Sequence, residues 1–417
     1  MRSGLAIALL LGAATAHADD LAVGAAVGAG GQGDAGYGAL ELRLDGEWRG
    51  IRIGLGGRAV WEGGAFRTRE WSRPVDAIAL LRQLEASVGP VALAAGALAP
   101  STIGHVAEGY RATLDDRART GARIAVDTRT EDRSSVDVDA SVEIDDVLDP
   151  ALVGGAIAWQ VVPAWGLHAA TAVDPATSRL AIELGAARRW ERDDSRVDIG
   201  VSLVGERWRA SAMGDPTGDP MGDPMGDPTG DPTGDSIRAM GAPRIGLGAV
   251  AFASAGLDRA NARWTIGADV RAGTGTNGAA FGPLYRAERS PIAGATNTSA
   301  GGAGVTRAIL DDARAGFGAG LAASVTADRG WLSLGARYRP GLGPLGTFGA
   351  GAPMGRRLQS AAWIAASPRA TAGVAEVRAV WATHFYTALG FARMYLTDES
   401  AIAPAWSATV WFGAVSR

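Results

Sequence analysis

The side chains of this chain that are able to do chemistry are few and stand far apart in the sequence. Beyond the N-terminal segment the histidines are His105, His168 and His384, and no two of them have the spacing of metal ligands. There is no cysteine, and no serine stands in a motif that marks a nucleophile. No Walker loop is present, and the glycine-rich stretch 28–33 lacks the strand-to-helix setting of a dinucleotide site. We therefore predict a protein that is not an enzyme, with no catalytic residue, no metal site and no cofactor.

The remaining candidates are charged residues, and these alternate with apolar ones. Between 136 and 145 the apolar positions are Val136, Val138, Ala140, Val142 and Ile144, and the polar positions are Asp137, Asp139, Ser141, Glu143 and Asp145. Side chains of a β-strand point alternately to its two faces, so this segment has one apolar face and one acidic face. The same parity recurs at 40–45, 51–61, 180–189, 197–206, 263–271 and 332–339. The pattern predicts a protein built of many strands.

The length of these strands is typical of a transmembrane β-barrel. The alternating windows run about 9–12 residues, close to what a tilted strand needs to cross a bilayer, whereas strands of soluble proteins are usually about half as long. Aromatic residues stand near strand ends, as in the interfacial girdles of such barrels: Trp48, Trp61, Trp190, Trp208, Trp331, Phe385, Trp406 and Trp411. We predict an all-β fold, an antiparallel transmembrane β-barrel of about 16 strands, with 14 to 18 also acceptable. The alternative is a soluble antiparallel β-protein, apolar inside and polar outside.

The N-terminus has the features of a cleavable secretory signal peptide. Arg2 precedes an apolar run from Leu5 to Ala16, and Ala16-His17-Ala18 fits the small-x-small cleavage rule. Residues 1–18 are therefore assigned to the signal peptide, and residues 19–417 to one barrel domain. No later segment reaches about 18 uninterrupted apolar residues, the length of a membrane-spanning helix. These features predict export to the outer membrane of a Gram-negative cell.

A protein in that location has two expected partners, the outer-membrane lipid and the barrel assembly machinery. The formal net charge of −4 is close to neutral and argues against nucleic acid as a partner. The C-terminus departs from the habit of such barrels, which usually end on an aromatic residue. Here Phe412 is followed by residues 413–417, which contain none.

Charges on the polar face are the candidates for the lining of a pore. They are Arg43, Arg52, Arg58, Arg123, Asp137, Asp139, Glu143 and Asp145. Opposed walls of arginine and carboxylate produce a transverse field, which selects small polar solutes. The alternative is a sealed lumen in which these charges pair across strands. The predicted function is a passive channel for small polar solutes or a structural scaffold, and the other class considered is a secreted or periplasmic soluble β-rich protein that binds a partner.

Two regions break the alternation. In the first, apolar residues recur three apart, which predicts a short helix near 74–87 or a distorted strand: Val75, Ile78, Leu81 and Leu84. The second, 214–235, consists of tandem Gly-Asp-Pro-Thr/Met units, and proline at every fourth position prevents a strand ladder. We interpret this repeat as a surface loop without one fixed conformation. Calcium binding by its evenly spaced aspartates is the alternative, although the spacing matches neither the EF-hand nor the nonapeptide calcium repeat.

The stretch from Trp71 to Gly154 resembles a group of uncharacterised outer-membrane β-barrel proteins of Gram-negative bacteria. The resemblance rests on Trp71, Pro74, Asp76, Gly96-Ala97-Leu98, Thr102-Ile103-Gly104-His105, Tyr110, Asp115, Asp145-Asp146-Val147, Pro150, Val153 and Gly154. Val106 follows His105 where the pattern of the group leads us to expect glycine. The resemblance implies a barrel and no assigned activity. Within it, His105 and Tyr110 are candidates for pinning a loop inside the lumen.

Overall fold

The computed structural model describes residues 20–32, 35–66, 74–98, 101–110, 120–128, 138–148, 150–162, 164–175, 178–192, 194–211, 240–259, 261–274, 281, 315–340, 343–354, 357–368, 370–382, 385–396 and 405–416. Several sequence predictions concern residues outside these ranges. They are the signal peptide, the Gly-Asp-Pro repeat, Asp137 and His384.

The described residues confirm an all-β protein with one large antiparallel sheet. That sheet has 21 strands, and β7 and β8 form a separate two-stranded sheet. The strands are β1 (Asp20–Gln32), β2 (Ala35–Trp48), β3 (Ile51–Glu62), β4 (Ala65–Phe66), β5 (Leu81–Val88), β6 (Val91–Gly96), β7 (Ser101–Ile103), β8 (Ala107–Tyr110), β9 (Gly121–Asp127), β10 (Val138–Ile144), β11 (Val153–Val162), β12 (Trp165–Asp174), β13 (Arg179–Arg192), β14 (Ser195–Ser211), β15 (Met240–Arg259), β16 (Ala262–Gly273), β17 (Gly316–Ala327), β18 (Gly330–Arg339), β19 (Gly343–Met354), β20 (Leu358–Ala366), β21 (Ala370–Ala382), β22 (Phe385–Leu396) and β23 (Ala405–Ser416). A 3-10 helix, η2, covers Pro74–Leu80. Within the described ranges no helix is long and apolar enough to cross a membrane.

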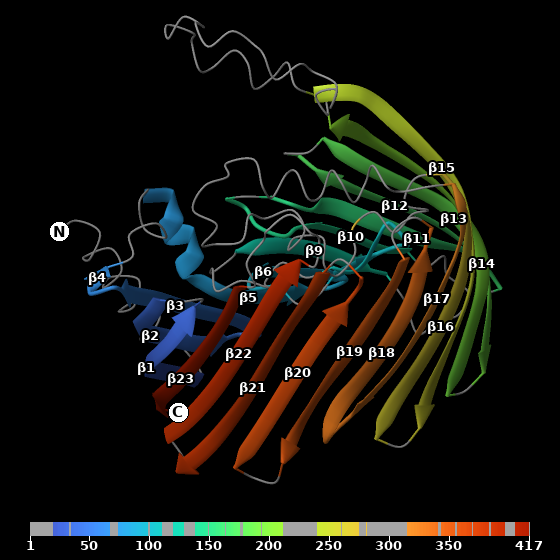
Figure 1. The fold of residues 1–417 in the computed structure, drawn as a ribbon. Coiled ribbons are helices and arrows are strands. Elements are labelled where there is room, and N and C mark those ends of the chain that lie inside the picture. The colour runs from blue at the N-terminus through green and yellow to red at the C-terminus, as the bar shows by residue number, and fades with distance from the viewer. Residues whose placement is uncertain are drawn as a thin grey trace, which may run out of the picture.

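Strands of the large sheet pair mainly with their neighbours in the sequence, and the first strand also pairs with the last. β1 contacts β2 on one side and β23 on the other, from Val23 opposite Ser416 to Gln32 opposite Ser407. Figure 1 shows the blue N-terminal strands beside the red C-terminal ones, with the rest of the sheet curving between them. Among the described strands of this sheet, the two-residue β4 alone has a single partner, β3.

The predicted number of about 16 strands is lower than the 21 strands of the large sheet. The sequence pattern does not reveal two of the longer strands, β5 and β19. Spacing of the apolar residues predicts a helix over 74–87, but η2 ends at Leu80 and Leu81–Val88 forms β5. Strand β19 shows no clear alternation in the sequence, because glycines and prolines occupy many of its positions. A Cβ at Gly349 would lie 2.7 Å from the Trp331 ring on the neighbouring strand, so glycine leaves room for the indole there while weakening the sequence signal.

The alternation predicted from the sequence is confirmed by the burial of neighbouring side chains. Glu183 and Ser202 are 0% and 2% exposed on the face that contacts hairpin β7–β8, which we call the inner face. Leu184 and Leu203, the next residues along the same strands, are 61% and 70% exposed on the opposite, outer face. The outer face of the sheet is therefore apolar.

Five exposed aromatic residues of the outer face lie next to short connections. They are Trp48, Trp165, Trp190, Trp264 and Phe385, beside the connections at 49–50, 163–164, 193–194, 260–261 and 383–384. Other exposed aromatic residues lie elsewhere on this face, for example Phe317 at the start of β17 and Tyr338 near the end of β18. Trp208 is 4% exposed and shares its parity with the buried Ser202 and Val204, so its assignment to an outer girdle is wrong. Trp331 likewise faces Gly349 and Gly351 on the inner face. Whether a tryptophan lies on the outer or the inner face follows from its position in the alternation along its strand. It does not follow from its nearness to a strand end.

The connections at the opposite edge vary more in length. The longest lie between β14 and β15, at 212–239, and between β16 and β17, at 274–315. Because consecutive strands run antiparallel, the short connections lie along one edge of the sheet and these long ones along the other. An edge of tight turns opposite an edge of long loops is the arrangement of bacterial transmembrane barrels.

Deletion of residues 214–235 should leave assembly of the sheet unchanged. Ser211 and Met240 are register partners, so the residual link has to join two positions on adjacent strands. Shortening the loop changes its closure entropy by only about 0.6 kcal/mol per halving of length. The measurement is the migration of unheated and heated protein in SDS gels, and protease added to intact cells should cut the undeleted repeat. Loss of assembly would contradict the prediction, as would protease resistance that disappears when calcium is chelated.

Candidate functional site

Hairpin β7–β8 packs against the inner face of the large sheet. Ile103, Val106, Ala107 and Tyr110 are each at most 2% exposed. They form one apolar cluster with residues of the sheet and its connections: Leu152, Ala170, Ala172, Ala181, Val204, Val250 and Phe281. We call the part of the large sheet that faces the hairpin the wall. Three of its residues in this cluster are alanines, which leave space for the larger hairpin side chains. Burial of this apolar surface stabilises the docked hairpin by about 25 cal/mol per Å².

The turn of the hairpin requires glycine at Gly104. Its φ of +51° lies in the left-handed region, which favours glycine. A Cβ at this position would also lie 2.8 Å from the Ala170 side chain and would overlap the Glu183 carboxylate. The close approach of Gly104 to the sheet brings the next residue, His105, against β13.

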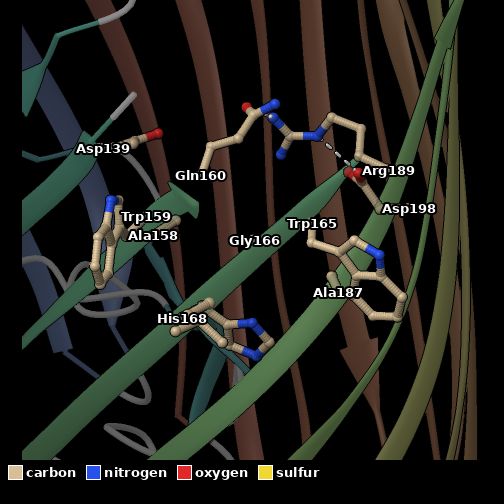
Figure 2. A pocket seen from close by; sticks show the side chains of 11 residues that line it. Asp139, Ala158, Trp159, Gln160, Trp165, Gly166, His168, Ala187, Arg189 and Asp198 are labelled. Atoms are coloured by element: carbon tan, nitrogen blue, oxygen red, sulfur yellow. Dashed lines mark hydrogen bonds and ion pairs between the residues drawn. The ribbon is translucent and has the colours of Figure 1, made fainter. Parts of the chain in front are cut away.

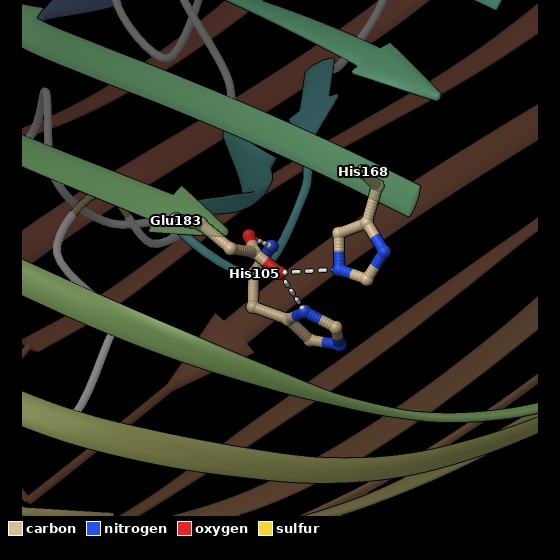
Figure 3. Close-up of side chains that lie close together, drawn as sticks. All are labelled: His105, His168 and Glu183. Carbon is tan, nitrogen blue, oxygen red and sulfur yellow. Dashed lines mark hydrogen bonds and ion pairs between the residues drawn. The ribbon is translucent and has the colours of Figure 1, made fainter. Parts of the chain in front are cut away.

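His105, His168 and Glu183 form a cluster where the hairpin turn meets the wall (Figure 3). Glu183 Oε1 is 2.7 Å from His105 Nδ1 and 3.1 Å from His168 Nε2, and Glu183 Oε2 accepts a 2.6 Å hydrogen bond from the His105 backbone N–H. His168 Nε2 is also 2.8 Å from Ser202 Oγ. The Glu183 side chain is fully buried, so two imidazoles and a backbone N–H replace the water that the carboxylate loses.

A second polar cluster holds the other end of the turn. Arg271 on β16 contacts Glu108 of the hairpin, donates from Nε to Asp269 Oδ2 at 2.6 Å and from Nη1 to the His105 carbonyl at 3.3 Å. Arg337 on β18 contacts Glu108 as well and lies 3.1 Å from Asp269 Oδ1. The Arg271 side chain is 2% exposed. Two arginines and two carboxylates therefore share one buried network between hairpin and wall.

Tyr110 anchors the far strand of the hairpin. Its hydroxyl donates to Asp145 Oδ2, and Asp145 Oδ1 accepts hydrogen bonds from the backbone N–H groups of Ala151 and Leu152 at 2.9 and 3.0 Å. The segment at Phe281 pairs with the hairpin, because its N–H donates to Val106 and its carbonyl accepts from Glu108. Both residues proposed as loop pins, His105 and Tyr110, thus contact the wall through buried carboxylates.

All the predicted pore-lining charges except Asp137, which is outside the described ranges, lie on the inner face. Pairs of opposite charge form locally: Arg43 with Asp45 at 2.6 Å, Arg52 with Glu85 at 3.1 Å, and Arg123 with Glu143 at 2.6 Å. Arg58 lies over the Tyr37 ring at 5.7 Å. Asp139 is exposed beside the cavity described next, and Asp145 is held by Tyr110.

A cavity of about 80 Å³ lies on the sheet beside His168 (Figure 2). It is lined by Asp139, Ala158, Trp159, Gln160, Trp165, Gly166, Leu167, His168, Ala187, Arg189 and Asp198. Arg189 donates from Nε to Asp198 Oδ1 at 2.9 Å and from Nη1 to Gln160 at 3.2 Å. The cavity is large enough for several water molecules.

Sequence reasoning missed the residues of the wall that hold the hairpin. Glu183 and Arg271 carry the parity of the polar face, but nothing in the sequence separates them from other charges of that face. Glu183 is 78 residues from His105, and Arg271 is 163 residues from Glu108. A signal exists for Gly104, His105, Tyr110 and Asp145, through the motif that carries the resemblance.

No protein-family model matches the chain, and no curated protein sequence matches it. Among solved structures it is similar to OccK11 (OpdR) of Pseudomonas aeruginosa, with 10% identity, coverage of 96% of each chain and a TM-score of 0.36. It is also similar to OccK5 (OpdH) of the same species, with 7% identity over 95% of this chain and 97% of that one, and a TM-score of 0.35. A BenF-like porin from Pseudomonas fluorescens gives 8% identity over 95% and 99%, with a TM-score of 0.33. At these TM-scores the likenesses decide neither the fold nor the activity of this chain.

Proposed function

We propose that the chain forms a transmembrane β-barrel in the outer membrane of a Gram-negative cell and acts as a passive channel for small polar solutes. The observation that carries the proposal is the division of one sheet into an apolar outer face and a charged inner face. Large apolar side chains stay exposed on the outer face, for example Ile245 at 72% and Leu203 at 70%. A soluble protein rarely exposes so extensive an apolar surface, whereas lipid covers it in a membrane barrel. The aromatic residues near the short turns match an interfacial girdle.

Closure of the sheet into a barrel is part of this proposal. In the hydrocarbon region no water can satisfy a backbone N–H or C=O group, so a spanning sheet needs a partner for every strand. The pairing of β1 with β23 supports closure, because it supplies the partner that each terminal strand would otherwise lack. Tight turns along one edge are consistent with the periplasmic side, and the long connections with the cell exterior.

Cell fractionation combined with SDS gels tests the barrel against the soluble alternative. We expect the protein in the outer-membrane fraction, and a closed barrel should migrate differently before and after boiling. A secreted or periplasmic β-rich binding protein would be found in the soluble fraction without a heat-dependent shift. That result would overturn the barrel proposal.

Conductance separates the channel from a scaffold with the same fold. Purified protein inserted into planar lipid bilayers should give ohmic current steps. The inner face supplies charges for a hydrated path, since the ion pair of Arg52 and Glu85 has side chains 60% and 44% exposed. Inserted, heat-shifting protein that never conducts would overturn the channel and leave a structural scaffold.

Replacing Arg52 and Arg58 together by alanine should shift ion preference toward cations. The double change removes two positive charges and leaves the Glu85 carboxylate without its ion pair, so the local potential becomes more negative. The measurement is the reversal potential under a salt gradient. The matched control is Glu85→Gln, which removes the opposite charge of the same pair and should shift the reversal potential toward anions. Equal reversal potentials in both variants and the wild type would show that ions do not pass these residues.

A further inference from the structure

We propose that His105, His168 and Glu183 form a binding site for a divalent transition-metal ion of the zinc type. The ion would tie the turn of hairpin β7–β8 to strands β12 and β13. This proposal concerns a metal site and does not depend on solute transport.

The three side chains converge from three separate segments of the chain. One ligand atom from each lies within 4.8 Å of the other two. Both histidines aim a ring nitrogen at the same carboxylate oxygen, Glu183 Oε1, at 2.7 and 3.1 Å. Ligands of a tetrahedral zinc ion stand about 3.4 Å apart for bonds of about 2.1 Å. Small side-chain rotations would therefore open enough space for an ion in place of the two shared hydrogen bonds.

The chemistry of the donors selects the class of metal. Two imidazole nitrogens and one carboxylate oxygen suit zinc and its first-row neighbours, whereas calcium and magnesium prefer oxygen ligands alone. Three protein ligands leave a fourth position for water or for the Ser202 hydroxyl, which is 2.8 Å from His168 Nε2. The donor set matches three-ligand zinc sites that keep one position open.

The surroundings hold these ligands in place. The His105 backbone N–H donates to Glu183 Oε2 at 2.6 Å, which fixes the carboxylate and leaves Oε1 to face the histidines. The Phe252 ring lies 4.7 Å from the His105 ring and 5.7 Å from the His168 ring, and covers one side of the cluster. A Cβ at Gly185 would overlap His168 and lie 2.6 Å from Ser202 Oγ, so glycine provides the space next to the histidine.

An ion has access to the cluster from the cavity on the sheet. His168 belongs to the lining of that cavity, together with Asp139 and Asp198, and the two histidine side chains are 17% and 19% exposed. Because one ligand belongs to the hairpin and two belong to the wall, the complete donor set exists only while the hairpin is docked. Metal binding should therefore stabilise the docked hairpin.

The test uses the full chain without an affinity tag, folded in detergent and stripped of metal with EDTA. Titration with zinc chloride in a calorimeter should give one ion per chain. Cobalt chloride should produce the visible bands of a four-coordinate site, and added zinc should abolish them. His168→Ala should weaken zinc binding at least tenfold, because even the loss of an outer-shell partner of a metal ligand weakens binding by about 10–100-fold. His384→Ala is the matched control and should bind as the wild type does.

A second measurement keeps the proposal testable if a cluster variant fails to fold. Zinc should protect His105 and His168 of the wild-type protein from modification by diethylpyrocarbonate, read by mass spectrometry, and should leave the reactivity of His384 unchanged. Wild-type protein that takes up no stoichiometric zinc would overturn the proposal and leave a hairpin held by hydrogen bonds alone. Binding that His168→Ala leaves intact, or that His384→Ala abolishes, would overturn it as well.

Discussion

Replacing Arg271 by alanine should lower the free energy of unfolding by about 3 kcal/mol or more. The Arg271 side chain is 2% exposed and contacts the carboxylates of Glu108 and Asp269. Without it, Arg337 is the one described cation left against both carboxylates, and one buried negative charge stays uncompensated. The bond to the His105 carbonyl is lost too, which loosens the hairpin turn. Unfolding by guanidinium in detergent, followed by tryptophan fluorescence, measures the effect.

An exposed ion pair between β15 and the strand of Arg271, β16, provides the control for this prediction. Arg263 pairs with Asp258 at 2.7 Å near the turn at 260–261, and both side chains are largely exposed. Arg263→Ala should leave the unfolding midpoint unchanged, because solvent screens such a pair. Arg271→Lys should recover part of the loss, since it keeps the charge without the planar fork of donors. Equal midpoints for Arg271→Ala and Arg263→Ala would mean that the buried network adds no stability.

The sequence prediction of the fold rests on the alternation of apolar and polar residues along each strand. On β14 the alternation of Val201 and Leu203 with Ser202 and Val204 corresponds to alternating exposed and buried side chains. Parity fails where both faces are occupied by small residues or where proline interrupts, as in β19. It also fails in β5, where a helical spacing continues past Leu80 while the backbone has already become a strand. The class of fold follows from the sequence, and the number of strands does not.

The candidate site depends on contacts that a sequence cannot supply. His105 and Tyr110 stand out through a motif, but their role as pins stays a prediction. His168 lies opposite Gly185 and Glu183 opposite Ala170, and this register, set by pairing of β12 with β13, brings the two side chains together. Sequence spacing gives no sign of it, because the three possible ligands lie in three separate segments of the chain. For the same reason, charges expected to line opposed walls pair locally, as Arg123 does with Glu143.

Val142→Arg should destabilise the protein by about 2–4 kcal/mol, the cost of an arginine on the lipid face near the bilayer midplane. Val142 is 61% exposed on the outer face, in the middle of β10, and the adjacent Ile124 of β9 is 52% exposed. The described register partners of Val142 are Ile124 and Gly155, which offer no polar side chain, so a charge there must draw water or lipid headgroups toward it.

The matched control is Asp139→Arg, three residues away on the same strand but on the inner face. Asp139 is exposed beside the cavity, where water is able to solvate a new guanidinium. We expect this variant to assemble with a normal heat-dependent shift and to unfold near the wild-type midpoint, whereas Val142→Arg should assemble poorly or unfold at lower denaturant. Both substitutions introduce the same side chain into one strand. A difference in assembly or in unfolding midpoint between the two variants is therefore due to the face on which the arginine lies and not to the residue type. If Asp139→Arg fails to assemble while Val142→Arg is tolerated, lipid does not cover the outer face, and the membrane proposal falls with it.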